Sequence, residues 1–298
     1  MINLELPKFL RAGAAQAHQA AAEIFRPISR KYDLAEHEYP RELDTLASMM
    51  DGMADGGNAF SGAAGGRGDE KKKQRTGVKN GGNMASLLNV IETCWGDVGL
   101  TLSLPYQGLG NSALAAVATD EQLESFGKTW AAMAITEPSF GSDSSAVSTT
   151  ARKDGDEYVI NGEKIFVTSG DRADSVVVWA TLDKSLGRAA IKSFLVKKGT
   201  PGFTVERLEE KLGIRASDTA VLRLDNVRVP AENLLGSPEI DVKKSFAGAM
   251  ATFDNTRPLV AGMAIGVARA ALEELRRILE EAGLEIDYDK PAHTQHAA

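Results

Sequence analysis

Cysteine is nearly absent from this sequence. Of its 298 residues only Cys94 is a cysteine, so an internal disulfide bond is excluded. Such a composition suits a reducing compartment. Cys94 stands between Thr93 and Trp95 in an apolar stretch. A reactive thiol would need a basic partner such as a nearby histidine, so the pattern favours a buried structural cysteine.

Long apolar runs and an excess of positive charge are missing as well. No segment reaches the ~18 consecutive apolar residues of a membrane span. The first residues, MINLELPKFL, lack the basic and apolar regions of a secretory signal. Lys and Arg number 34 against 41 Asp and Glu, for a net charge of -7, which argues against a nucleic-acid-binding surface. We therefore expect a cytoplasmic protein with no nucleic-acid partner and no membrane span.

Histidine is scarce too, and it stands in no pattern typical of metal ligands. No histidine combines with Cys or Glu at a spacing that zinc sites use, so we expect no metal site. The pair nearest the C-terminus lies in a polar tail, where a chance pairing is the favoured interpretation. The four histidines are His18, His37, His293 and His296.

What the sequence does contain falls into three blocks, and the first is helical. Residues 6–50 and 84–130 are rich in strong helix formers such as Ala, Leu, Gln and Glu. Pro27 predicts a kink or a restart of the first helix, and Pro40 favours the first turn of a second one. Between the two regions, residues 51–83 are rich in Gly and charge and predict a flexible loop.

One pattern inside this block has to be separated from a nucleotide-binding motif. Gly108, Gly110 and Ala113 spell G-x-G-x-x-A, a dinucleotide fingerprint when it follows a strand. Pro105 interrupts the preceding segment, which makes that segment a weak central strand. No alternation of strands and helices follows. A loop entering a helix is therefore the favoured interpretation.

The second block has the pattern of β-strands. Asp154-Gly155 and Asn161-Gly162 are each flanked by strand-like runs and predict hairpin turns. The run DSVVVWATL predicts a buried strand because β-branched residues dominate it. Further strands are predicted over KSFLVKKG, FTVERLEEK and TAVLRLDNVRVP.

The third block begins after Gly236 and predicts a long amphipathic helix. Small residues recur along it at Gly262, Ala264, Gly266 and Ala268, which favours close packing against another helix. Its apolar face has no later predicted element to cover it. Segregated helical and strand blocks indicate an α+β fold. We expect an N-terminal helical domain (1–130, with the insertion 51–83), a middle antiparallel β domain (131–235) and a truncated C-terminal helical domain (236–298).

The stretch AITEPSFGSDSSA, from Ala134 to Ala146, joins the first two blocks. Gly, Ser, Pro and Asp are typical of turns for local backbone reasons, so composition alone favours a surface turn. The same stretch resembles the first signature of the acyl-CoA dehydrogenase family of flavoproteins. Phe140 departs from the family pattern, which usually has Ala or Gly at that position.

Further blocks resemble the same family in the same order. DEYVINGEKIFVTSG resembles its β-hairpin, and LGIRASDTAVLRLDNVRVPAENLLG resembles the stretch that leaves its β domain. FDNTRPLVAGMAIGVARAAL resembles the first long helix of its C-terminal domain. The resemblance covers roughly the entire chain except the Gly-rich insertion, and it is the combination of blocks that makes it specific.

The resemblance implies α,β-dehydrogenation of an acyl-CoA thioester with FAD as cofactor. In the family a carboxylate removes the α-proton and a hydride passes from the β-carbon to flavin N5. The electrons then pass to an electron-transferring flavoprotein. We also expect a homo- or hetero-oligomer, and a role in fatty acid metabolism through β-oxidation. A related flavin monooxygenase or nitroalkane oxidase on the same fold is an alternative.

The matching positions imply the site residues. An isoalloxazine ring needs an apolar slot with a few donors, which apolar and hydroxyl side chains can supply. The implied cofactor-binding residues are Met133, Ile135, Thr136, Gly141, Ser142, Phe166, Val167 and Thr168, and the implied substrate-binding residues are Ser142, Phe253, Asp254 and Arg257. At Thr168 the alternative is an ordinary strand threonine. Asp254 and Arg257, three apart on one helix face, could instead form a surface ion pair of little energetic value.

No catalytic residue is predicted in this chain. In most of the family the base is a Glu late in the C-terminal domain, and in some relatives it stands at the position of Thr256. Glu137 lies in the signature turn, where a structural role is favoured. We expect a fragment of a longer enzyme that shows no turnover alone; the alternative is a naturally short, non-catalytic partner subunit that binds flavin or acyl-CoA.

Overall fold

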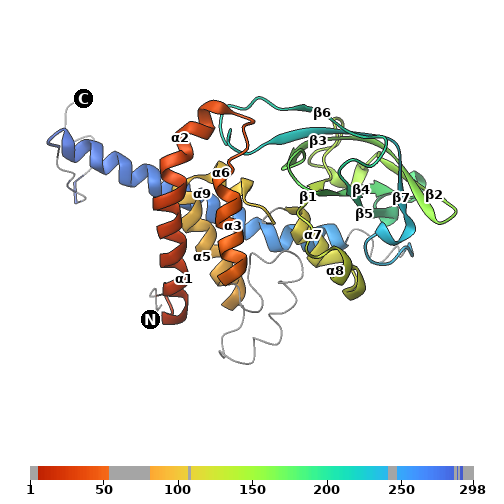
Figure 1. Ribbon diagram of the computed structural model, residues 1–298, viewed down its shortest axis with the longest axis horizontal. Helices are drawn as coiled ribbons and strands as arrows, with labels where there is room; N and C mark the ends of the chain where they lie inside the picture. The colour runs from red at the N-terminus through yellow and green to blue at the C-terminus, as the bar shows by residue number, and fades with distance from the viewer. Residues whose placement is uncertain are drawn as a thin grey trace.

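A computed structural model describes residues 6–53, 81–106, 109–240, 247–284, 287, 289 and 290 (Figure 1). Helices occupy both ends of the chain and strands occupy its middle. The helices are α1 (Lys8–Ala20), the π-helical turn Ala21–Phe25, α2 (Arg26–Ala35), α3 (Glu42–Met53), α5 (Gly81–Gly96), α6 (Val98–Ser103), α7 (Leu109–Val117), α8 (Asp120–Phe126) and α9 (Ala247–Glu281). The strands are β1 (Ala131–Ala134), β2 (Thr150–Asp154), β3 (Glu157–Thr168), β4 (Ser175–Thr181), β5 (Ile191–Lys197), β6 (Phe203–Leu208) and β7 (Thr219–Pro230).

The helical predictions hold with local adjustments. At Pro27, where the sequence predicted a kink or a restart, the backbone stays helical from α1 into α2. The irregularity there is a π-helical turn before α2, with Pro27 in the first turn of α2. Of the loop predicted at 51–83, residues 54–80 lie outside the described residues, and its two ends belong to α3 and α5. In the described part of the chain, no helix has the length and apolar character that crossing a membrane requires.

Helix α9 runs behind the molecule and packs along α5 and α7 (Figure 1). The predicted close packing of its small residues is confirmed. A Cβ on Gly266 would lie 2.4 Å from the carbonyl oxygen of Ile91, so only glycine fits at that crossing. The other face carries exposed apolar side chains, among them Val260, Ile265 and Leu275, as the sequence predicted. No other described element covers them.

The sheet is mixed, so the predicted all-antiparallel arrangement is wrong. Strand order is β1-β4-β2-β3-β7-β6, with β5 paired to β4. Strand β1 runs parallel to β4, from the pair Ala131–Ser175 to the pair Ala134–Val178. Every residue of both strands is buried, which is typical of strands covered on two sides. Turn residues in a sequence indicate only pairings between consecutive strands. Strands β1 and β4 are not consecutive, because the β2–β3 hairpin lies between them in the sequence.

The second predicted hairpin turn is also wrong. Asp154-Gly155 does lie at the β2–β3 turn, but Asn161 and Gly162 lie inside β3. The pairing of β3 with β7 shifts register there. A Cβ on Gly162 would lie 2.3 Å from the hydroxyl oxygen of Thr149. The Asn-Gly pair thus marks a bulge and a close approach of chains, a common use of glycine within a strand.

The glycine pattern at the start of α7 has a packing role. A Cβ on Gly110 would lie 2.3 Å from the carbonyl oxygens of Ala131 and Ala132. Glycine therefore lets α7 lie directly against β1. Because the preceding described element is α6, the motif does not follow a strand, in agreement with a helix entry. Gly108, the first residue of the pattern, lies outside the described residues.

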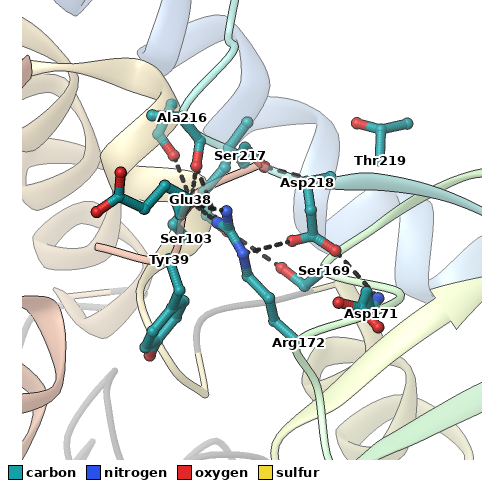
Figure 2. Close-up of polar contacts among 12 residues, drawn as sticks. Glu38, Tyr39, Ser103, Ser169, Asp171, Arg172, Ala216, Ser217, Asp218 and Thr219 are labelled. Carbon is teal, nitrogen blue, oxygen red and sulfur yellow. Dashed lines mark hydrogen bonds and ion pairs between the residues drawn. The ribbon is translucent and has the colours of Figure 1, made fainter. Parts of the chain in front are cut away.

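A buried arginine joins the helical region to the β domain (Figure 2). Arg172, in the connection between β3 and β4, donates to the backbone carbonyl oxygens of Ala216 and Glu38 at 2.8 and 3.0 Å, and to the hydroxyl of Ser103 at 3.0 Å. Its Nε lies 3.4 Å from the carboxylate of Asp218, and both side chains are buried. One side chain thus contacts segments from both regions.

Candidate functional site

One cavity of about 300 Å³ lies where β1, β3 and α9 meet. Its walls combine apolar side chains, three hydroxyl groups and one guanidinium group. Among the described residues that line it, none is acidic. The lining residues are Leu109, Met133, Ile135, Thr136, Gly141, Ser142, Ser144, Ile165, Phe166, Phe253 and Arg257.

The signature stretch forms one wall by turning sharply after β1. Glu137 and Phe140 pair through two backbone hydrogen bonds of 3.1 Å, which close a tight turn. Asp143 accepts hydrogen bonds from the backbone and hydroxyl of Ser145 and so begins a short 3-10 turn. The turn carries Ser142 and Gly141 to the cavity. Locally the stretch is the surface turn that its composition predicts.

The adjoining wall is a bulge in β3. The register of β3 against β7 shifts between Lys164 and Val167. There Ile165 leaves the ladder and donates its N–H to the carbonyl oxygen of Thr136 at 2.9 Å. Phe166 has a φ of 58°, a left-handed conformation that is uncommon for a bulky residue, and its side chain is 62% exposed. The bulge therefore turns an aromatic ring into the cavity wall, away from the core.

Behind these walls lies a buried ion pair that sequence reasoning missed. Lys164 Nζ lies 2.7 Å from Glu137 Oε1, and the two side chains are 0% and 2% exposed. Burial raises the pKa of the Glu137 carboxyl, but the Lys164 charge and hydrogen bonds from Lys164, Ser148 and Thr149 outweigh it, so the pKa falls to about 2. Burial lowers the pKa of Lys164 to about 8, although Glu137 opposes that shift. The structural role expected of Glu137 agrees with this geometry.

The third wall comes from α9. The guanidinium carbon of Arg257 lies 5.2 Å from the centre of the Phe253 ring. Arg257 is also 3.7 Å from Asp254, but both charged side chains are largely exposed, so the pair adds little stability. Thr256 is buried and donates its hydroxyl to the carbonyl oxygen of Thr252 at 3.0 Å.

Most of the predicted site residues meet at this cavity, and three do not line it. Val167 is 1% exposed and packs in the β-domain core. Thr168 pairs with Thr219 in the sheet, and Asp254 lies on the exposed side of α9. Three lining residues were not predicted: Leu109, Ser144 and Ile165. Ser144 stands two positions after Ser142 in the signature and could have been found there, whereas Leu109 reaches the cavity only through the packing of α7 on β1.

A helical region joined to a mixed-sheet domain, with a cavity of apolar and polar side chains between β1, β3 and α9, matches known proteins. Residues 132–227 match the model of the acyl-CoA dehydrogenase middle domain. The chain is 37% identical over 211 residues to a short-chain-specific acyl-CoA dehydrogenase of Clostridium acetobutylicum, covering 67% of this chain and 54% of that protein. The chain thus spans about half the length of this curated relative.

Solved structures agree. Butyryl-CoA dehydrogenase from Megasphaera elsdenii superposes with a TM-score of 0.74 at 30% identity, covering 98% of this chain and 73% of that one. A chain from the structure of an electron transferring flavoprotein of Acidaminococcus fermentans gives a TM-score of 0.75 at 28% identity, covering 98% and 73%. The chain belongs to the acyl-CoA dehydrogenase family.

Proposed function

We propose that this chain supplies the flavin-binding and CoA-binding residues of an enzyme that converts an acyl-CoA thioester to the trans-2-enoyl-CoA. The observation that carries the proposal is the cavity itself, which gathers eight predicted residues from three separate segments. Family membership supports the reaction class. The proposal includes an electron-transferring flavoprotein as electron acceptor, which the similarity to the Acidaminococcus structure supports.

The cavity lining fits an isoalloxazine ring. Such a ring needs a flat apolar slot with a few donors at its polar edge. Met133, Ile135 and the exposed ring of Phe166 all supply apolar surface to the cavity. A large aromatic ring held in contact with solvent by a left-handed backbone is an unfavourable feature unless a ligand covers it. The hydroxyls of Thr136 and Ser142 would serve the polar edge.

Bound FAD would supply the hydride acceptor. The roles of this chain's residues follow from their positions in the cavity. Thr136 and Ser142 would orient the ring, and Phe166 would exclude water from its face. In the proposal Val167 and Thr168 contribute through the β3 backbone that carries Phe166. Gly141, where an added Cβ would meet nothing within 4 Å, leaves open space beside the signature turn.

Arg257 and Phe253 are proposed to hold the CoA portion of the substrate. The guanidinium group is a planar cation suited to anionic and aromatic groups. Within the described part of the chain, Arg257 pairs with Asp254 through a long contact of 3.7 Å, which leaves guanidinium donors available. Asp254 would orient Arg257 from outside the cavity.

The described lining residues offer no base for the α-proton. The proposal therefore assigns binding, not proton abstraction, to this chain, and expects the family's Glu to complete the reaction. A second candidate, which the lack of an acidic lining residue favours, is a partner subunit that binds flavin and acyl-CoA without turnover. A cytoplasmic location, an oligomeric assembly and a place in β-oxidation belong to the proposal as expectations.

Visible spectroscopy and turnover assays test the proposal. The purified 298-residue chain should bind FAD and show a flavin band that shifts when butyryl-CoA is added. It should not reduce an artificial electron acceptor in steady state. The variants Phe166→Ala and Arg257→Ala should weaken the flavin and acyl-CoA effects, respectively. Wild-type protein that binds neither ligand would contradict the proposal, and steady turnover would contradict the expectation that the base is missing.

A further inference from the structure

We propose that the buried Glu137–Lys164 pair is a positioning pair that holds two walls of the cavity at a set separation. The proposal rests on the proposed function only in assigning those walls to a flavin. The pair itself contacts no cavity space, because neither residue lines it. Its effect on a ligand would therefore act through the backbone of Ile135, Thr136 and Ile165.

The lysine end of the pair ties β3 to the end of β1. Lys164 Nζ donates to Glu137 Oε1 at 2.7 Å and to the backbone carbonyl oxygen of Ile135 at 3.2 Å. The residues that follow Lys164 and Ile135 are linked as well, because the Ile165 N–H donates to the carbonyl oxygen of Thr136. Two adjacent links thus join consecutive residues of one wall to consecutive residues of the other.

The glutamate end adds a third segment. Glu137 Oε2 accepts from the backbone N–H and the hydroxyl of Ser148 at 2.7 and 2.5 Å, and Oε1 accepts from the N–H of Thr149 at 2.9 Å. One carboxylate therefore satisfies four donors from two segments. Charge-assisted hydrogen bonds are stronger than neutral ones, and a buried network of them holds the segments that it joins in one arrangement.

Stability alone accounts poorly for such a pair. A buried ion pair must repay the loss of hydration of two charges, and apolar residues of similar volume are often as stable or more so. A role in fixing the local backbone geometry explains the pair better, because Lys164 lies directly before the bulge that carries Phe166. A bulky residue at a φ of 58° persists only where its surroundings over-determine it. The Lys164 and Ile165 links supply that constraint.

A test compares the pair with the other buried ion pair of the β domain. Glu137→Gln and Lys164→Met remove the proposed constraint, whereas Asp218→Asn disrupts the Arg172–Asp218 pair, which has no contact with the cavity lining. Hydrogen–deuterium exchange on the full chain without flavin reports the Ile165 amide and its neighbours. FAD affinity and the visible circular dichroism of bound flavin report the cavity.

We expect faster exchange in peptides 134–140 and 162–168 for both pair variants but not for Asp218→Asn. FAD binding should weaken roughly 10- to 100-fold in the pair variants, the effect of misplacing one or two ligand hydrogen bonds. The visible circular dichroism should change with it. Ser148→Ala, which removes one hydroxyl donor, should give a smaller effect of the same kind and keeps the test informative if Lys164→Met does not fold.

Two results would overturn the proposal. One is wild-type exchange at these peptides and wild-type FAD affinity in folded pair variants. The other is an equal loss of both in Asp218→Asn, which would show a general effect of instability. If wild-type protein binds no FAD, the proposed function fails, and the exchange comparison alone still decides whether the pair positions the two walls.

Discussion

The guanidinium carbon of Arg257 lies 5.2 Å from the centre of the Phe253 ring, and both side chains line the cavity. A cation–π contact uses the face of the guanidinium plane and leaves its N–H donors at the edge. If the proposed function is correct, these donors would serve the CoA portion of the substrate.

Arg257→Ala should weaken acyl-CoA binding about 10- to 100-fold, because a hydrogen bond to a charged group contributes about 1.5–3 kcal/mol. The free energy of unfolding should change by less than about 0.5 kcal/mol, as for other exposed substitutions. Isothermal titration calorimetry with butyryl-CoA measures the first and urea unfolding the second. Arg223→Ala, which removes an exposed arginine on β7, is the matched control and should leave binding unchanged. Equal losses in both variants would contradict a specific role.

Substitutions at Phe166 test whether this residue, with its left-handed backbone, contributes to FAD binding. Phe166→Gly and Phe166→Ala both remove the ring, but glycine adopts a φ of 58° without steric cost. Phe166→Gly should therefore be more stable than Phe166→Ala by about 1 kcal/mol. Both variants should bind FAD more weakly than wild type. Chemical unfolding and fluorescence titration with FAD measure the two effects, and unchanged FAD affinity in both variants would remove the ring from the site.

The Glu137 carboxylate should make stability depend on acid pH. Its pKa in the folded protein is about 2, below the ordinary value of 4.5, so the folded state binds its proton more weakly than the unfolded state. The stabilisation is therefore complete above pH 4.5 and is lost as the pH falls through about 2, a loss of the order of a few kcal/mol. Urea unfolding at a series of pH values measures it.

Glu137→Gln is the control for this dependence. The variant should be less stable at pH 7, because Lys164 loses its buried partner. Its stability should fall less steeply with acid than that of wild type, since the titrating group is gone. An identical slope in the two proteins between pH 4.5 and 2 would show that other carboxylates control acid stability.

Arg172 should be critical to the contact between the helical region and the β domain. Arg172→Met removes three hydrogen bonds and leaves the buried Asp218 carboxylate without its cation, so we expect a loss of about 3–5 kcal/mol. Adding Asp218→Asn should recover part of that loss. Arg30→Ala, at an exposed pair on α2, should cost less than about 0.5 kcal/mol. Urea unfolding of these variants measures each effect, and a cost for Arg172→Met as small as that of Arg30→Ala would contradict this role.

Most helices and strands could be predicted from the sequence, because periodicity and turn residues act locally. The buried run over Ser175–Thr181 and the hairpin at Asp154-Gly155 were both visible in this way. The signature from Ala134 to Ala146, together with the later matching blocks, indicated the family and predicted that Thr136 and Ser142, which line the cavity, belong to a site. These features need only the order of residues along the chain.

Other features could not be predicted from the sequence, because they depend on segments that meet only after folding. The parallel pairing of β1 with β4 has no local sequence pattern. The dipeptide Asn161-Gly162 is compatible with both a hairpin turn and a β-bulge, so the sequence could not distinguish them. In the sequence, nothing distinguishes Lys164 from an ordinary strand lysine. Its ion pair forms only because β3 lies against the turn that carries Glu137. A side chain's role is set by the charges and carbonyl groups around it, and these come from distant parts of the chain.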